Sequence, residues 1–229
     1  MQFRHLVFVL FIVTRALSAS VKSHDSFVPF PASGGPLETA YQPQLHIGNG
    51  CHSYPAVNAQ GDWSGGLYPS GSPSAGCSDP TKGQTYVRST NNYKGRIAMV
   101  YCWYMPKDEP VPTTGHRHEW EGAVVFLDIK THNIDGVATS AHGHWRKYYN
   151  PNGTNVDGTH VKVEYSAEGL NSHAIRLTDK DGDLPNLAQW DRLGGPAQQA
   201  INNPSNWGAA NPPIAQMHYQ MTLEGAWMW

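Results

Sequence analysis

The chain has 229 residues, a formal net charge of −2, and 15% charged side chains. This balance argues against nucleic acid as a partner, because proteins that bind nucleic acid usually carry a clustered excess of positive charge. Glycine (23 residues), proline (17) and tyrosine (11) are abundant. This composition is typical of a turn-rich, all-β or α+β domain.

Residues 1–18 have the organisation of an export signal. Arg4 precedes the apolar run Leu6–Val13, and the small residues Ala16 and Ser18 offer a cleavage site. The apolar run is too short to span a bilayer, and no later stretch reaches the required length. We therefore expect a secreted, extracellular protein.

The rest of the chain has the length of one domain. Residues 19–43 are expected to form a loosely ordered amino-terminal arm, because Val21–Pro36 mixes serine, proline and glycine with few apolar side chains. Residues 44–229 are expected to form a single domain, long enough to bury a substantial core.

Two further features suit an exported chain. The segment between Cys51 and Cys77 is rich in glycine, serine, proline and alanine, so it cannot build a core by itself. A disulfide between these cysteines is expected, and it would stabilise the fold by roughly 3 kcal/mol in the chain-entropy model. The remaining Cys102 lies in an apolar run and is expected to be a buried free thiol. Asn152-Gly153-Thr154 is a glycosylation sequon in a turn-rich loop.

The central block of the chain reads as strand, loop and strand. Ile97–Met105 is apolar and aromatic, which is typical of a buried strand. Pro106, Pro110 and Pro112 are expected to end its ladder, because proline lacks the N–H group. Gly122–Leu127 is a second apolar run of strand length.

Polar side chains gather where the second strand begins. On a regular strand His116 and His118 would share one face, and Glu119 and Glu121 the other. A site that uses a histidine together with the glutamates therefore needs a bend next to His116, which Gly115 permits.

Asp108, on the preceding loop, could fold back towards Glu119 and Glu121. Three close carboxylates repel each other unless a positive charge lies among them. A hard divalent cation, Mg²⁺ or Ca²⁺, would supply that charge. The alternative is a solvated acidic loop whose charges pair with Arg117 or Lys107.

The heptad GHRHEWE, residues 115–121, closely resembles the signature of the necrosis- and ethylene-inducing-protein-like family of secreted cytolysins. The block Ala98–Asp108 (AMVYCWYMPKD) also resembles the family, with Cys102 where serine is common. The resemblance extends from about Gln44 to about Pro212. It implies an all-β fold with peripheral helices, a two-sheet β-sandwich similar to actinoporins and fungal lectins.

The resemblance also implies a site. Asp108 and Glu121 match the family's principal carboxylate ligands of a divalent cation, His116 matches its histidine, and Glu119 stands where the family usually has aspartate. The extra methylene of Glu119 shifts its carboxylate by more than the few tenths of an ångström that ligand distances tolerate.

A further set, His118, His142 and His173, comprises candidates for the head-group or cleft side of the site. His142 lies in a Ser-Ala-His-Gly stretch that, in the family, is near the metal loop.

The function implied by the resemblance is cytolysis without turnover of a substrate. Family members bind the sugar head groups of plant sphingolipids and damage the plant plasma membrane, causing necrosis. Plants sense peptides from the central block through a pattern-recognition receptor. The protein is expected to be a virulence factor and a monomer.

The resemblance does not identify a single residue for contact with the membrane. In the family, the loop before the residue aligned with His173 exposes a tryptophan, but the corresponding loop here, Ser166–Ser172, has no aromatic residue. Leu170 is its only large apolar side chain, so either Leu170 or a neighbouring aromatic residue, Trp145 or Tyr148, would contact the lipid. Alternatively, Leu170 packs beneath the loop.

Two other functional classes stay open. One is a non-toxic, lectin-like glycan binder. The other is a cupin-like metal enzyme, suggested by His116-x-His118 followed by Glu121, which would need both histidines on one side of a metal.

The second half of the sequence predicts mostly strands. Gly136–Thr139 and Ala174–Thr178 are expected as strands, and His160–Tyr165 alternates like an edge strand. Leu184–Asn202 has helical spacing. The tail Ala215–Trp229 has no assigned role.

Overall fold

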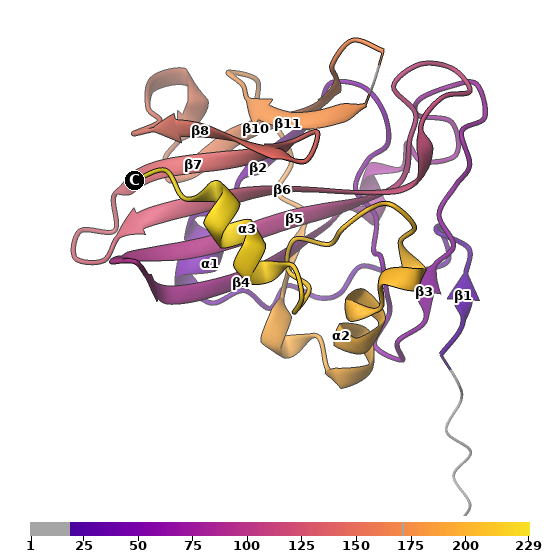
Figure 1. Ribbon diagram of the computed structural model, residues 1–229, viewed down its shortest axis with the longest axis horizontal. Coiled ribbons are helices and arrows are strands. Elements are labelled where there is room, and N and C mark those ends of the chain that lie inside the picture. Colours follow the sequence, from indigo (N-terminus) through magenta and orange to yellow (C-terminus); the bar gives the residue numbers. More distant parts are fainter. Residues whose placement is uncertain (1–18, 171) are drawn as a thin grey trace, which may run out of the picture.

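The structure is a computed structural model that describes residues 19–170 and 172–229. One curled sheet dominates it (Figure 1). Its strands are β2 (Gln44–Ile47), β4 (Gln84–Tyr93), β5 (Arg96–Asp108), β6 (His116–Asp128), β7 (Ile134–Ala141), β8 (His144–Tyr149), β9 (Val156–Asp157), β10 (His160–Ala167), β11 (His173–Leu177) and β12 (Asn186–Gln189). The expected export signal, residues 1–18, lies outside the described residues.

The sheet folds into two facing halves. Its strand order is β12-β4-β5-β6-β7-β11-β10-β2, with β8 paired to β7 and β9 to β10. Between β7 and β11 the ladder narrows to the single pair Ala141–Ala174. A hydrogen bond of 2.8 Å from the Thr139 hydroxyl to the main-chain oxygen of Ile175 ties the halves together. The predicted all-β fold is confirmed, and one continuous ladder forms both layers.

β5 runs through the centre of the sheet. It pairs with β4 on one side and with β6 on the other, and Ile97–Met105 is buried throughout. Such a strand has no solvated face, which explains its continuous apolar and aromatic sequence. Cys102 is a buried free thiol, as predicted.

Three local predictions are wrong. The β5 ladder does not end at Pro106: Lys107 and Asp108 still pair with β6, and the proline oxygen accepts a 2.7 Å hydrogen bond from the Leu67 amide. β10 is not an edge strand, because it lies between β11 and β2. Leu184–Asn202 is not helical throughout, because its first part is β12, paired in parallel with β4.

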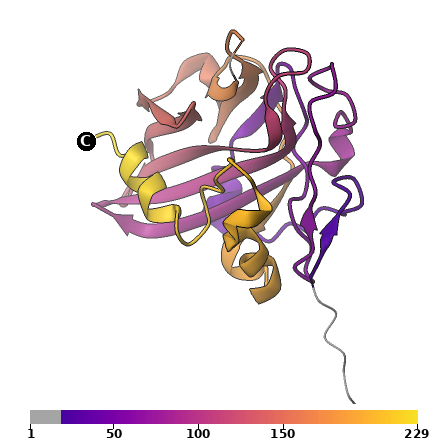
Figure 2. The same ribbon diagram turned by 45° about the vertical axis from the view of Figure 1, so that its right-hand side comes forward.

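Short helices cover the outside of the sheet. They are α1 (Pro36–Ala40), α2 (Gly195–Asn202) and α3 (Tyr219–Ala226). Figures 1 and 2 show α3 lying across the strands on one outer face, with α2 below it. No helix among the described residues is long and apolar enough to cross a membrane.

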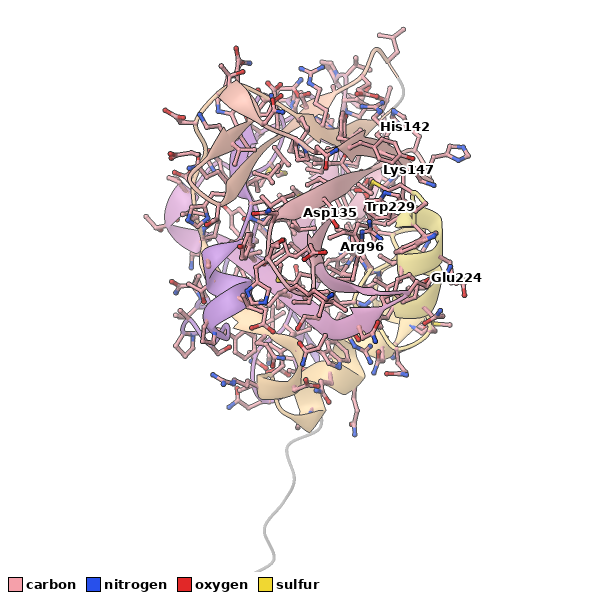
Figure 3. All side chains as sticks on the ribbon, turned by 90° about the vertical axis from the view of Figure 1, so that its left-hand side faces the viewer. Arg96, Asp135, His142, Lys147, Glu224 and Trp229 are labelled. Carbon is pink, nitrogen blue, oxygen red and sulfur yellow. A yellow bond between two sulfur atoms is a disulfide. The ribbon has the colours of Figure 1, made fainter. Side chains whose placement is uncertain are left out.

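The residues after α3 have a structural role that the sequence did not suggest. The Trp227 and Trp229 rings pack edge-on against Phe126 of β6. Figure 3 shows Trp229 near Arg96, whose guanidinium carbon lies 3.7 Å from the centre of the Trp229 ring. Arg96 also pairs with Asp135 at 3.0 Å. The tail is thereby held on the sheet by aromatic and cation–π contacts.

Residues 19–43, expected as a loosely ordered arm, run along the loop closed by the cysteines. β1 (Val21–Lys22) pairs in parallel with β3 (Trp63–Ser64). Phe27 is buried, and the His24 ring donates to the main-chain oxygen of Gly76 at 2.7 Å. The division of the chain between residues 43 and 44 stays a prediction.

Candidate metal centre

The end of β5, the start of β6 and the loop between them form a hairpin arm, residues 106–121, that carries the predicted ligands. Asp108 closes β5 opposite His116, which opens β6, so the ladder itself brings these residues together. Gly115 turns the chain into β6 with a φ of 94°, and a Cβ at this position would lie 2.1 Å from the main-chain oxygen of Asp108. Only glycine fits this turn.

A second irregularity lies inside β6. His118 has a φ of 61°, in the left-handed region, although it is within the strand. Because this residue interrupts the regular alternation of side chains, His116 and Glu119 reach the same side of the arm. The bend predicted at Gly115 is present, and the break at His118 completes it.

Three side chains form a cluster suited to a cation. Ligand atoms of Asp108, His116 and Glu119 lie within 4.8 Å of one another. The His116 Nε2 atom is 3.7 Å from Asp108 Oδ2 and 3.6 Å from Glu119 Oε2. His116 Nδ1 donates to the main-chain oxygen of His118 at 2.9 Å, which leaves the lone pair of Nε2 free in the neutral ring.

Asp108 is fixed from behind by the start of β11. The buried His173 ring donates from Nδ1 to Asp108 Oδ1 at 2.5 Å, and the Ser172 hydroxyl donates to Oδ2 at 2.7 Å. Burial by itself would raise the pKa of Asp108, but these hydrogen bonds outweigh it and lower the pKa below its usual value. Asp108 is therefore an oriented carboxylate that favours its ionised form, as a candidate cation ligand requires.

Glu119 and Glu121 have the opposite character. Burial, reinforced by the charge of Asp108, raises the pKa of Glu119 to about 8. Burial and the nearby Glu119 raise the pKa of Glu121 well above its usual value, although Glu121 accepts a hydrogen bond from the Ser140 hydroxyl. Glu121 stands next to the three-residue cluster, and its role as a ligand stays a prediction.

The charges around the carboxylates support a cation site. Among residues 19–170 and 172–229, no lysine or arginine pairs with Asp108, Glu119 or Glu121. The proposed alternative partners are engaged elsewhere: Lys107 pairs with the buried Glu109 at 2.5 Å, and the Arg117 guanidinium lies over the Tyr68 ring. The donor set, with oxygen atoms and one imidazole, fits a hard divalent cation.

Two of the histidines predicted for the cleft, His118 and His142, differ in whether they line the cavity. His118 lies away from the cluster, hydrogen-bonded to the Tyr104 hydroxyl at 2.7 Å and packed against Trp207. His118 therefore does not line the cavity, and the cupin-like arrangement with both histidines on one side of a metal is absent. His142 does line the cavity, where its ring lies 3.2 Å from Glu168.

The cluster opens into a cavity of about 560 Å³ with two walls. One wall is formed by β6 and the β7–β8 turn, including His116, Glu119, Glu121 and His142. The other wall is formed by the segment before α3, with Ala209, Ala210, Asn211 and Pro213, and by the tail, with His218, Met221, Thr222 and Gly225.

Sequence reasoning missed the tail residues of this cavity. His218 donates from Nδ1 to the main-chain oxygen of Pro212 at 3.2 Å, which leaves its Nε2 atom as a free acceptor in the neutral ring. His218 and His116 belong to no common sequence motif. Only the fold brings them to the same cavity.

Comparisons with known proteins agree with this architecture. Residues 36–226 match the model of the NPP1 family, described as necrosis inducing protein. The chain belongs to this family. It is 41% identical over 234 residues to NLP effector protein 10 of Phytophthora capsici, covering 96% of this chain and 99% of that protein.

Two solved structures of the family show the same fold. Necrosis and ethylene inducing protein 2, from the causal agent of cocoa's witches' broom disease, superimposes with a TM-score of 0.91 at 63% identity, covering 93% of this chain and all of that chain. NLPPya in complex with mannosamine superimposes with a TM-score of 0.86 at 36% identity, covering 91% and 100%.

The NPP1 match is longer than the resemblance found in the sequence. It begins at residue 36 rather than about Gln44, and it continues to residue 226 rather than about Pro212. The family match therefore includes α3. The tail was not recognised because its residues act through packing and carry no catalytic or ligand motif.

Leu170 and Trp145, two of the three candidates for membrane contact, occupy different environments in this NPP1 domain. Leu170 is 75% exposed at the tip of the β10–β11 loop, so it does not pack beneath the loop. Trp145 is half-buried in the cavity wall, where a Cβ added to Gly225 would lie 2.8 Å from its ring. Trp145 is placed to contact a ligand in the cavity.

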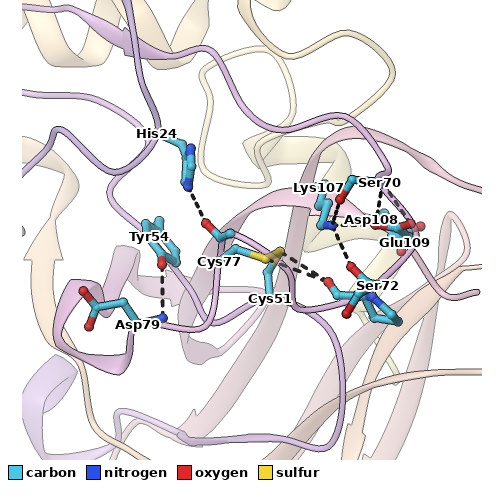
Figure 4. Close-up of a disulfide and its surroundings, with 12 residues drawn as sticks. His24, Cys51, Tyr54, Ser70, Ser72, Cys77, Asp79, Lys107, Asp108 and Glu109 are labelled. Carbon is cyan, nitrogen blue, oxygen red and sulfur yellow. Dashed lines mark hydrogen bonds and ion pairs between the residues drawn. A yellow bond between two sulfur atoms is a disulfide. The ribbon is translucent and has the colours of Figure 1, made fainter. Parts of the chain in front are cut away.

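The disulfide Cys51–Cys77 is present, as predicted, with 5.0 Å between its Cα atoms (Figure 4). It closes a loop that braces the hairpin arm. The Glu109 carboxylate accepts hydrogen bonds from the amides of Ser70 and Gly71 in this loop. The disulfide loop therefore holds Glu109 in place, next to the candidate ligand Asp108.

Proposed function

We propose that this NPP1-family protein is a secreted cytolysin that binds the sugar head group of plant plasma-membrane sphingolipids through a divalent cation. The observation that carries the proposal is the position of the Asp108–His116–Glu119 cluster beside a wide cavity, which His116 and Glu119 line. A cation held there, Mg²⁺ or Ca²⁺, would keep coordination positions open towards the cavity. The sugar hydroxyls would occupy those positions.

The lining of the cavity suits a sugar. Ser140, Asn211 and the histidines offer donors and acceptors, and Trp145 offers an aromatic face. Such a mixture of a few oriented polar groups with an apolar surface is typical of small-molecule sites. The family member NLPPya is described in complex with mannosamine, which supports an amino sugar or hexose as the ligand class.

Binding is proposed to lead to membrane damage and necrosis without turnover of a substrate. The necrosis-inducing description of the family supports this outcome. Leu170, on the exposed β10–β11 loop, would enter the outer leaflet once the head group is held. Because leucine lacks the amphipathic ring of tryptophan, we expect a higher dose to be needed than in relatives with a loop tryptophan.

A second proposed partner is a plant pattern-recognition receptor for peptide fragments. In the folded protein Ala98–Met105 is fully buried, so a receptor could reach this part of the central block only after proteolysis. We propose the monomer as the binding unit and extracellular action at the host membrane. Nucleic acid is not a proposed partner.

The experiment that tests the function combines calorimetry with dye leakage. Mg²⁺ and Ca²⁺ are titrated into the purified protein, mannosamine is then titrated into the cation-loaded form, and leakage is measured from vesicles of plant plasma-membrane lipids. Asp108→Ala should abolish cation binding, sugar binding and leakage together. Asp179→Ala, which removes an exposed carboxylate far from the cluster, is the matched control.

Leaf infiltration extends the same test to necrosis, with dicot and monocot leaves compared. Full leakage by folded Asp108→Ala would remove the cluster from the mechanism. Sugar binding without leakage or necrosis would instead identify a non-toxic glycan binder.

A further inference from the structure

The loop between β8 and β9 presents the Asn152-Gly153-Thr154 sequon to solvent. Asn152 and Thr154 are both exposed. Asn152 precedes a short 3₁₀ turn, Gly153–Asn155, and its side chain makes no capping hydrogen bond. The side-chain amide is therefore accessible and is not needed to hold the turn.

Beside the sequon lies a hollow that no part of the proposed function uses. It has a volume of about 380 Å³, and its lining includes Pro151, Asn152, Gly153, Tyr41, His132 and Thr159. Its size is within the range of small-molecule sites, about 300–1,000 Å³. A sugar attached to Asn152 would start at the rim of this hollow.

The sequon lies far from the metal cavity. The His144 end of β8 lines that cavity, whereas the loop with Asn152 follows the opposite end, at Tyr149. The five steps from His144 to Tyr149, at about 3.3 Å per residue, separate the two ends by roughly 17 Å. Figure 1 shows the β5–β6 loop and the loop after β8 at opposite sides of the molecule.

We propose that Asn152 is N-glycosylated and that the first N-acetylglucosamine rests in the adjacent hollow, next to Tyr41. In this reaction the Nδ2 atom of Asn152 forms a bond to C1 of an oligosaccharide carried on a polyprenyl diphosphate. The bond from C1 to the diphosphate oxygen breaks, the amide loses one proton, and the polyprenyl diphosphate leaves. The glycan projects away from the cavity and leaves it open to its ligand.

The sequence contains a matched internal control. Asn203-Pro204-Ser205 has the same spacing, but proline at the middle position excludes it from the sequon. The exposed Ser205 lies within a turn of the same 3₁₀ type, Pro204–Asn206. Modification is therefore expected at Asn152 and not at Asn203.

The first test is to secrete the full chain from a yeast host and measure intact and peptide masses before and after treatment with an N-glycosidase. We expect one N-glycan, on the peptide with Asn152. Asn152→Gln and Thr154→Ala should both lack it, and Thr154→Ser should keep it. Secreted wild-type protein with an unmodified Asn152 would overturn the proposal.

The position of the first sugar is tested on folded protein. An endoglycosidase that leaves one N-acetylglucosamine is compared with complete removal of the glycan, which converts Asn152 to aspartate, and with unglycosylated Thr154→Ala, which keeps the asparagine. We expect the single sugar to retain a higher Tm, and mannosamine affinity to be unchanged in all of these forms. Equal Tm values would disprove the seating in the hollow, whatever the outcome for the proposed cytolysin.

Discussion

The imidazole of His173 donates from Nδ1 to the Asp108 carboxylate at 2.5 Å, inside the protein and behind the candidate metal ligands. Asp108 lies on the hairpin arm of one half of the sheet, and His173 opens β11 of the other half. The hydrogen bond therefore makes the position of a ligand depend on how the two halves are joined.

The first prediction concerns this hydrogen bond. His173→Ala should weaken cation binding by about 10- to 100-fold, because Asp108 loses the partner that orients it. Calorimetric titration with Mg²⁺ and Ca²⁺ measures the change. His132→Ala, at the exposed turn between β6 and β7 and away from the metal cavity, is the control for removing an imidazole. Unchanged cation affinity in folded His173→Ala would contradict the assignment.

The second prediction is a pH dependence of the cation-free protein. The pKa of Glu119 is raised from 4.5 to about 8 on folding, so the folded state holds a proton that the unfolded chain releases. The free energy of unfolding should therefore fall as the pH rises from 4.5 towards 8. Because a bound cation replaces that proton, added Mg²⁺ or Ca²⁺ should raise Tm more at pH 8 than at pH 5.

Thermal unfolding with and without cation checks this second prediction. In Glu119→Gln the decline in stability with rising pH should be smaller. A cation-induced Tm shift of the same size at pH 5 and pH 8 would contradict the prediction.

The third prediction concerns Glu109, which holds the disulfide loop and neutralises Lys107. Burial opposes ionisation of Glu109, but the Lys107 ammonium and the main-chain amides outweigh it and lower the pKa to about 2. Glu109→Gln should lower the free energy of unfolding at pH 7 by about 1.5–3 kcal/mol. Since the folded-state pKa is depressed, this loss should be complete above pH 4.5 and shrink as the pH falls towards 2.

Urea unfolding at neutral and acidic pH measures the effect of Glu109→Gln. Glu224→Gln changes an exposed glutamate of α3 in the same way and should be nearly neutral. A loss of stability that does not depend on pH would assign the role of Glu109 to packing instead of charge.

The fourth prediction separates Leu170 and Trp145 as candidates for lipid contact. Leu170→Ala should raise the dose needed for vesicle leakage and leave mannosamine affinity unchanged, because Leu170 is exposed on its loop. Trp145→Ala should weaken mannosamine binding, because this ring belongs to the cavity wall. If both variants leak at the wild-type dose, neither side chain is the membrane anchor.

Local patterns in the sequence predicted the parts of the structure that local chemistry determines. The apolar run of β5, the free thiol of Cys102 and the disulfide all follow from composition and spacing. The ligand set, which also included Glu121, came from the family resemblance, and the closeness of Asp108, His116 and Glu119 follows from their places on one hairpin.

The rest depends on contacts between distant segments. The left-handed conformation of His118 has no signature in sequence, since it arises inside a strand and opposite a proline. This conformation turns the side chain of His118, which was predicted to line the cleft, towards Tyr104 and Trp207. Helical spacing was likewise misleading for β12, where pairing with β4 overrides it.

The two walls of the cavity have a consequence for how such proteins diversify. The candidate cation ligands come from β5 and β6, whereas the facing wall comes from residues some hundred positions later in the chain. Substitutions at His218 or Met221 can therefore reshape the space offered to a sugar while every ligand atom stays in place. The shape of the cavity can therefore vary through the tail while the candidate ligand residues of the two strands stay the same.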